Sequence, residues 1–314
     1  MPNKTSMHKL NRKNLISTHD LSLDEINLIL DESMNFVDYV ERKESLSLMK
    51  GKILAALFYE PSTRTRLSFE SAMLRLGGQV INAVGMENSS INKGETLYDT
   101  ARVISQFADI AAIRHPAKGS ASDFAAGSSI PVINGGDGIG EHPTQALLDL
   151  LTLKREFKSL NDFSISLVGD LKYGRTVHSL VYLLAKFGIK IIFVSPHGLK
   201  MPEEIIQDLK NLQVNFEENS DFEGALKKSD VVYMTRIQKE RFVDVSEYEL
   251  YSKSFVLNKD TILRLNSDLK ILHPLPRVNE LHQDVDSLPG ALYFDQVQNG
   301  VALRMALIKL LLTN

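Results

Sequence analysis

The sequence contains no cysteine in its 314 residues. Disulfide bonds, thiolate zinc sites and cysteine nucleophiles are therefore excluded within this chain. No apolar run approaches the ~20 residues of a membrane-spanning helix, and the best candidate, residues 180–194, is interrupted by Lys186 and Lys190. The first 14 residues are polar and basic without an apolar segment, so we expect no secretory signal. These absences fit a cytoplasmic protein.

A strong charge of one sign is missing as well. The net charge of −3 gives no attraction to nucleic acid or to an anionic membrane, so we expect neither as a partner. Basic residues must then act locally, in pockets. Hydrophobic residues make up 43% and charged residues 24%, which is typical of a globular chain. A length of 314 residues is large for one core and predicts two domains.

Short apolar runs alternate with helical patterns along the chain. Strands are predicted at residues 53–58, 79–84, 110–113, 132–134, 164–168, 190–194, 231–234, 271–273 and 291–294. Helices are predicted at residues 20–48, 67–76, 96–108, 143–157, 176–187, 203–212 and 300–312. This alternation is typical of α/β architecture with parallel sheets. We predict two doubly wound parallel-sheet domains joined by long helices.

The helix that opens at Pro143 is predicted to bridge these domains. The first domain is expected at residues 1–145 and the second at residues 146–297. The last helix, at about residues 298–314, is expected to pack back on the first domain. Because ligands gather at the carboxyl ends of strands in open α/β folds, we expect the active site in the cleft between the domains.

The densest group of polar side chains stands where a strand turns into a helix. The segment Ser62-Thr63-Arg64-Thr65-Arg66 follows the predicted strand 53–58. A helix start offers free backbone N–H groups and the positive end of the helix dipole. Guanidinium groups add forked donors that suit phosphate oxygens. The segment therefore predicts a phosphate site, although it lacks the lysine of the Walker loop.

Other polar groups also follow predicted strands or a glycine-rich stretch. They are Arg114, His142 with Gln145 on one face of a helix start, Arg236 with Gln238, and His273-Pro274-Leu275-Pro276. The two prolines fix the backbone, so that a carbonyl of this last segment can point into a cleft. The sequence leaves open whether the Leu275–Pro276 bond is cis.

Residues 169–176, GDLKYGRT, differ from the Walker A pattern only at Arg175, where that pattern requires lysine. A nucleotide-hydrolysing enzyme is therefore one alternative, with residues 292–295 as a second motif strand. Arginine does not replace the compact ammonium group of lysine at such a site. Arg175 is better explained as a residue that binds a carboxylate.

Four motifs, in this order, resemble those of the aspartate and ornithine carbamoyltransferase family. They are Ser62-Thr63-Arg64-Thr65, His142-Pro143-Thr144-Gln145, Arg236-Ile237-Gln238 and His273-Pro274-Leu275-Pro276. The resemblance covers essentially the whole chain. It implies that the first domain binds carbamoyl phosphate, that the second binds the amine substrate, and that no cofactor or metal takes part.

Within this family the chain resembles the aspartate branch. The ornithine enzymes typically carry a cysteine in the H-x-L-P motif, and this chain has none. Arg175 and Arg236 would present two cations, which suit a dicarboxylate and repel the ornithine side chain. The implied reaction transfers the carbamoyl group to the amine of L-aspartate, releases phosphate and belongs to pyrimidine biosynthesis. A carbamoyltransferase with another acceptor, such as ornithine, and a non-catalytic family member remain alternatives.

The resemblance also implies a role for each matching residue. Carbamoyl phosphate would be bound by Ser62, Thr63, Arg64, Thr65, Arg114, His142, Gln145 and the carbonyls of Leu275 and Pro276. Of these, Arg64, Thr65, Arg114 and His142 would be catalytic. Aspartate would be bound by Lys93, Arg175, Arg236 and Gln238. Ser89 and Lys93 match positions that reach a neighbouring subunit's active site, so a homotrimer is expected; some family members also bind separate regulatory chains.

Overall fold

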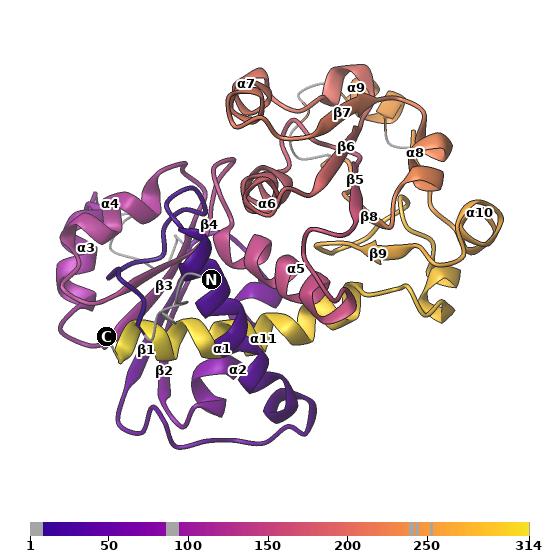
Figure 1. The fold of residues 1–314 in the computed structure, drawn as a ribbon. Coiled ribbons are helices and arrows are strands. Elements are labelled where there is room, and N and C mark those ends of the chain that lie inside the picture. The colour runs from indigo at the N-terminus through magenta and orange to yellow at the C-terminus, as the bar shows by residue number, and fades with distance from the viewer. Residues whose placement is uncertain (1–8, 86–93, 239–241, 243–244, 252–253, 314) are drawn as a thin grey trace. The chain divides into compact units, whose positions relative to one another are not determined.

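The computed structural model describes residues 9–85, 94–238, 242, 245–251 and 254–313 (Figure 1). The chain divides into two compact units, one formed by Met1–Leu151 with Val297–Asn314 and the other by Thr152–Gln296. Two long helices cross the boundaries, α5 (Pro143–Glu156) and α11 (Tyr293–Leu312). The first boundary therefore falls inside α5, six residues beyond the expected end at residue 145.

The first unit is built on a four-stranded sheet in the order β2-β1-β3-β4, and every neighbouring pair is parallel. Its strands are β1 (Ile53–Phe58), β2 (Gln79–Val84), β3 (Ile110–His115) and β4 (Val132–Asp137). Its other helices are α1 (Leu23–Glu41), α2 (Thr63–Arg75), α3 (Leu97–Ile104) and α4 (Ser120–Gly127). Strand β1 and the first four residues of β3 are continuous apolar runs, as expected for strands of a parallel sheet that is buried on both faces.

The second unit contains a five-stranded parallel sheet in the order β7-β6-β5-β8-β9. Its strands are β5 (Ser164–Val168), β6 (Lys190–Val194), β7 (Phe216–Asn219), β8 (Val231–Met234) and β9 (Lys270–Leu272). Its helices are α6 (Arg175–Lys186), α7 (Glu203–Asn211), α8 (Phe222–Lys228), α9 (Val245–Tyr251) and α10 (Lys259–Leu265), with 3-10 turns at His197–Leu199 and Gln283–Ser287. The predicted class of two parallel-sheet α/β domains is confirmed.

Each sheet has one point where the direction of strand addition reverses. In the first unit the chain adds β2 on one side of β1 and then β3 on the other, so that Phe58 lies in register with Arg114. In the second unit β6 and β8 flank β5 in the same way, and Val168 lies in register with Met234. Ligands of open α/β sheets bind beyond the carboxyl ends of the strands at such a reversal. The fold thus offers one ligand position in each unit.

Several predicted strands are confirmed with the expected bounds: 53–58, 79–84, 164–168, 190–194 and 231–234. The predicted strand at residues 291–294 is wrong, because helix α11 already begins at Tyr293 and only Ala291 forms an isolated bridge, to Ile271. A four-residue apolar run does not distinguish a strand from a buried helix start. Strand β7 was not predicted, since Phe216–Asn219 is a mostly polar edge strand.

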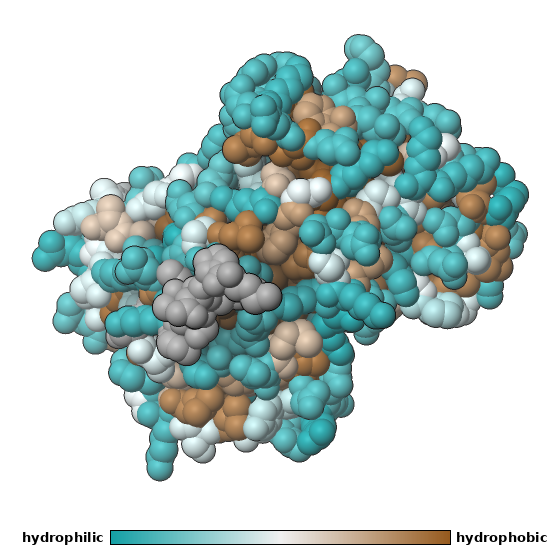
Figure 2. Space-filling view, in the orientation of Figure 1, coloured by the Kyte–Doolittle hydropathy of each residue, from teal (hydrophilic) through white to brown (hydrophobic). Residues whose placement is uncertain are grey.

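None of the described helices is long and apolar enough to cross a bilayer. On the face drawn in Figure 2, hydrophilic residues predominate and apolar patches lie between them. The larger apolar side chains are instead gathered in the cores, for example Phe124 in the first unit and Tyr293 in the second.

Gly169 sets the close approach of the two strands at the reversal in the second unit. Its φ is +116°, and a Cβ there would lie 2.3 Å from the carbonyl oxygen of Thr235. Only glycine combines this backbone angle with such an approach. The chain can therefore turn sharply after β5 beside the end of β8.

We expect Gly169→Ala to lower the free energy of unfolding by more than roughly 2 kcal/mol, because it adds a steric clash to backbone strain. Gly188→Ala is the matched control, since Gly188 also has a positive φ of +67° but open space around its Cβ position. That control should cost only about 1 kcal/mol. Urea denaturation of both variants measures the difference, and equal costs would contradict the close-approach explanation.

Candidate active site

The first predicted group lies at the start of α2, directly beyond the carboxyl end of β1. Ser62 is the N-cap residue, but its side chain makes no capping hydrogen bond, and the first turn holds no acidic side chain. Thr63 and Arg64 are exposed, whereas Thr65 is buried. Hydroxyl and guanidinium donors thus accompany the positive end of this helix, an arrangement that favours an anion.

Thr65 and His142 bring two of the motifs together. The hydroxyl of Thr65 lies 3.4 Å from Nε2 of His142, and both side chains are buried. His142 stands immediately before α5, so this contact joins the start of α5 to the start of α2. The structure therefore groups these two predicted residues.

Arg114 lies at the carboxyl end of β3, the neighbour of β1. Its Nε is 3.2 Å from a carboxylate oxygen of Glu60, and its Nη1 donates to the carbonyl of Gly135 at 3.4 Å. The backbone N–H of Tyr59 also donates to the carbonyl of Arg114 at 2.9 Å. These contacts hold the buried guanidinium at the edge where the strand order reverses. The neighbouring His115 has its pKa lowered by burial, which outweighs the opposing charge of Glu60.

Gln145 lies in the first turn of α5, and its side chain is fixed by a partner that sequence reasoning missed. The amide Nε2 of Gln145 donates to a carboxylate oxygen of Asp149 at 2.8 Å. Asp149 is completely buried. The spacing of four residues on a helix places such side chains side by side, so this pair could have been recognised in the sequence.

In the second unit, two loops meet beyond the ends of β5 and β8. The first leads to Arg175 at the start of α6, and the second carries Arg236 and Gln238. The amide Nε2 of Gln238 donates to the carbonyl of Tyr173 at 3.2 Å, which ties the second loop to the first. The structure thus groups the loops that carry all three predicted residues.

Asp170 supports these loops, although no role for it was predicted. Its carboxylate is completely buried and accepts a 2.9 Å hydrogen bond from the N–H of Tyr173. Burial raises the pKa of Asp170, while backbone N–H groups and the charge of Arg236 act in the opposite direction. A buried carboxylate beside Arg236 therefore anchors the turn that follows β5.

The segment His273-Pro274-Leu275-Pro276 follows β9, and its Leu275–Pro276 bond is cis. The N–H of Leu275 donates to Nδ1 of His273 at 2.8 Å, so the ring proton is on Nε2 and faces Glu280, also at 2.8 Å. Burial acts to raise the pKa of Glu280, but hydrogen bonds from His273 and the backbone hold that pKa below its ordinary value.

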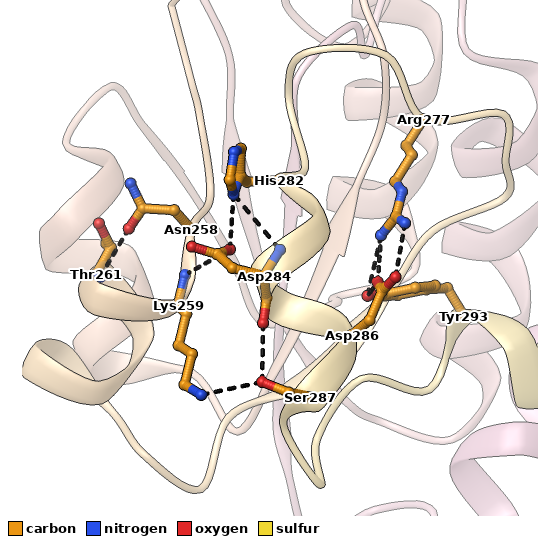
Figure 3. Close-up of polar contacts among 9 residues, drawn as sticks. All are labelled: Asn258, Lys259, Thr261, Arg277, His282, Asp284, Asp286, Ser287 and Tyr293. Atoms are coloured by element: carbon orange, nitrogen blue, oxygen red, sulfur yellow. Dashed lines mark hydrogen bonds and ion pairs between the residues drawn. The ribbon is translucent and has the colours of Figure 1, made fainter.

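Arg277 anchors the other end of this turn. Its Nη2 donates to a carboxylate oxygen of Asp286 at 2.8 Å, and its Nη1 donates to the hydroxyl of Tyr293 at 3.2 Å. Figure 3 shows the three side chains converging, and Tyr293 itself donates to Asp286. The carbonyls of Leu275 and Pro276 are thus held between two polar anchors.

Two predicted residues, Ser89 and Lys93, lie outside the described residues. Among the residues that the structure describes, no group of three or more histidine, aspartate or glutamate side chains is arranged to hold a metal ion.

Comparison with known proteins matches both units. Residues 13–155 match the model "Aspartate/ornithine carbamoyltransferase, carbamoyl-P binding domain", and residues 161–311 match "Aspartate/ornithine carbamoyltransferase, Asp/Orn binding domain". The second match includes residues 169–176, so the nucleotide-hydrolysing alternative gains no support.

Full-length relatives agree with these models. The aspartate carbamoyltransferase catalytic subunit of Leptospira biflexa is 47% identical over 96% of this chain and 97% of its own. The catalytic subunit of M. jannaschii aspartate transcarbamoylase superposes with a TM-score of 0.89, at 49% identity over 96% of this chain and 98% of its own. Aspartate transcarbamoylase from Trypanosoma cruzi, in complex with carbamoyl phosphate and aspartate, gives 0.88 at 37% identity over 95% and 96%.

The family models cover both units, and the curated relative matches 96% of the chain. The chain belongs to the aspartate/ornithine carbamoyltransferase family.

Proposed function

We propose that this chain is an aspartate carbamoyltransferase, which transfers the carbamoyl group of carbamoyl phosphate to the amine of L-aspartate. The products are N-carbamoyl-L-aspartate and phosphate, and the reaction is a step of pyrimidine biosynthesis. One observation carries the proposal: arginines stand at the strand-order reversal of both sheets, Arg114 in the first unit and Arg236 in the second. Two anionic substrates require cations at two positions.

The phosphate of carbamoyl phosphate would bind at the start of α2. Ser62, Thr63, Arg64 and Thr65 supply hydroxyl, guanidinium and backbone donors there, and Arg114 adds a second guanidinium from β3. Charge-assisted hydrogen bonds of this kind are about twice as strong as neutral ones. Because phosphate is also the leaving group, the same cations would stabilise the charge that develops as it departs.

The carbamoyl oxygen would face Thr65, Arg114 and His142. The aspartate amine attacks the carbamoyl carbon, a C–N bond forms, and the carbonyl oxygen becomes an oxyanion. Donors already in place stabilise that charge without reorganising, and the loss of one such donor typically costs roughly 3–4 kcal/mol. The C–O bond to phosphate then breaks, and the amine proton leaves with the phosphate.

Aspartate would bind in the second unit through Arg175, Arg236 and Gln238. The hydrogen bond from Gln238 to Tyr173 and the buried carboxylate of Asp170 hold the two loops that carry these residues. The Trypanosoma cruzi relative binds carbamoyl phosphate and aspartate, which supports the same pair of substrates here. Binding holds the two anions next to each other, so their translational freedom is already lost before they react. This effect accounts for much of the rate enhancement.

Assembly into a homotrimer is part of the proposal. Edge strand β2 is mostly exposed, and the neighbouring helix α2 exposes Leu67 and Leu74, which favours burial against another subunit. Ser89 and Lys93 would then act in the active site of a neighbouring copy. The absence of cysteine is compatible with a reducing compartment, and we place the enzyme in the cytoplasm.

The function is tested by phosphate release from carbamoyl phosphate with L-aspartate or L-ornithine as acceptor, without ATP. We expect release with aspartate alone, because two arginines match its two carboxylates and repel the ornithine ammonium group. Release with ornithine alone would overturn the roles of Arg175 and Arg236. No release with either acceptor would contradict the enzyme assignment.

Arg64→Ala tests the phosphate site. We expect kcat to fall by roughly 10²–10³-fold or more, because a charged donor to the departing phosphate is removed. The fold should be unchanged, since Arg64 is exposed. Arg42→Ala is the matched control, because the side chain of Arg42 is exposed and its 3.8 Å ion pair with Asp38 is exposed as well. Steady-state kinetics and circular dichroism measure both effects, and near-normal turnover by Arg64→Ala would refute the phosphate assignment.

A further inference from the structure

Two buried side chains of opposite charge, Arg304 and Asp149, lie behind Gln145. Arg304, from α11, is 2% exposed, and Asp149, from α5, is completely buried. Nη1 of Arg304 donates to the hydroxyl of Ser68 on α2 at 3.0 Å, and Nη2 donates to the hydroxyl of Thr144 on α5, also at 3.0 Å. One guanidinium therefore joins the phosphate-site helix, the helix of Gln145 and the C-terminal helix.

The surroundings of Arg304 are shaped to hold its side chain. The guanidinium lies 4.8 Å from the centre of the Phe69 ring, and Nη1 also donates to the carbonyl of Gly300 at 3.0 Å. A Cβ on Gly300 would lie only 2.7 Å from that Nη1 and 3.1 Å from Leu148. The absence of a side chain at Gly300 thus provides the space that the guanidinium occupies.

Arg304 carries its positive charge at neutral pH. Burial lowers the pKa of Arg304 to about 9, and the charge of Asp149 acts in the opposite direction. The guanidinium therefore stays positive at pH 7. Asp149 is the charged group that opposes this lowering, and a buried cation is stabilised by a buried anion near it.

An ionised Asp149 dictates the orientation of the Gln145 amide. A carboxylate only accepts hydrogen bonds, so the amide group that faces it must be the donor, Nε2. The observed 2.8 Å bond from Nε2 of Gln145 to Asp149 has this sense. The carbonyl oxygen Oε1 is then the atom of Gln145 that remains for a ligand, and it accepts from an N–H group.

We propose that Asp149, balanced by Arg304, is a positioning residue that turns Oε1 of Gln145 toward the carbamoyl amine. The pair would thereby select carbamoyl phosphate over an acyl phosphate that lacks the amine. This inference rests on the proposed function, because it assumes that Gln145 meets the amine of carbamoyl phosphate.

Acetyl phosphate is the probe, because a methyl group replaces the amine and nothing else differs at the carbonyl. Discrimination is the inhibition constant of acetyl phosphate divided by the KM of carbamoyl phosphate, measured with aspartate as acceptor. We expect Asp149→Asn to reduce this ratio about tenfold, because the Gln145 amide can then turn its Nε2 toward the amine. In a Gln145→Ala background the same substitution should leave the ratio unchanged.

Ser68→Ala is the matched control, since it removes another partner of Arg304 and keeps the bond between Gln145 and Asp149. Its discrimination ratio should equal that of the wild type. If Asp149→Asn fails to fold because Arg304 is left unbalanced, Asp149→Asn combined with Arg304→Gln removes both charges and should show the same tenfold loss.

If the wild type is active but neither Asp149 variant changes the discrimination ratio, this inference is wrong and the proposed function still stands. This inference is also wrong if Asp149→Asn lowers the discrimination ratio in the Gln145→Ala background. A wild type that transfers no carbamoyl group to aspartate would instead overturn the proposed function, and this inference with it.

Discussion

Neutralisation of the two anionic substrates proposed for this chain is the constraint on which the rest of the account depends. The net charge of −3 supplies no general attraction for anions, so the cations must be placed locally. Each parallel sheet provides one place for them, beyond the strand pair at which the strand order reverses. Arg114 follows this geometry in the first unit and Arg236 follows it in the second.

Buried polar groups keep other side chains and turns of the candidate site in position. Asp149 holds Gln145, Asp170 anchors the turn that precedes Arg175, and the bond between His273 and Glu280 supports the turn at Leu275. Each buried carboxylate is matched by a cation or by N–H donors, as burial of charge requires. The positions of the side chains at the site are thus fixed by groups that are proposed not to touch substrate.

Much of the architecture could be predicted from sequence because its signals are local. Apolar runs predicted the central strands, and polar clusters at their ends suggested Arg64 and Arg236 as candidate site residues. The hydrogen bond from Arg304 to Thr144 has no local signal, since α11 meets α5 only in the folded unit. The wrongly predicted strand at residues 291–294 has a different cause: its short apolar run fits a strand and a buried helix start equally well.

The central claim is that the two sets of cations act on the two substrates of one reaction. Calorimetric titration with a single compound that joins a phosphonate to L-aspartate tests it most directly. We expect this compound to bind roughly 10²-fold or more tightly than inorganic phosphate, because its second half binds without a further loss of translational freedom. Arg236→Ala should remove most of that advantage and leave phosphate binding unchanged. Equal affinity of wild type and variant for the joined compound would contradict the account.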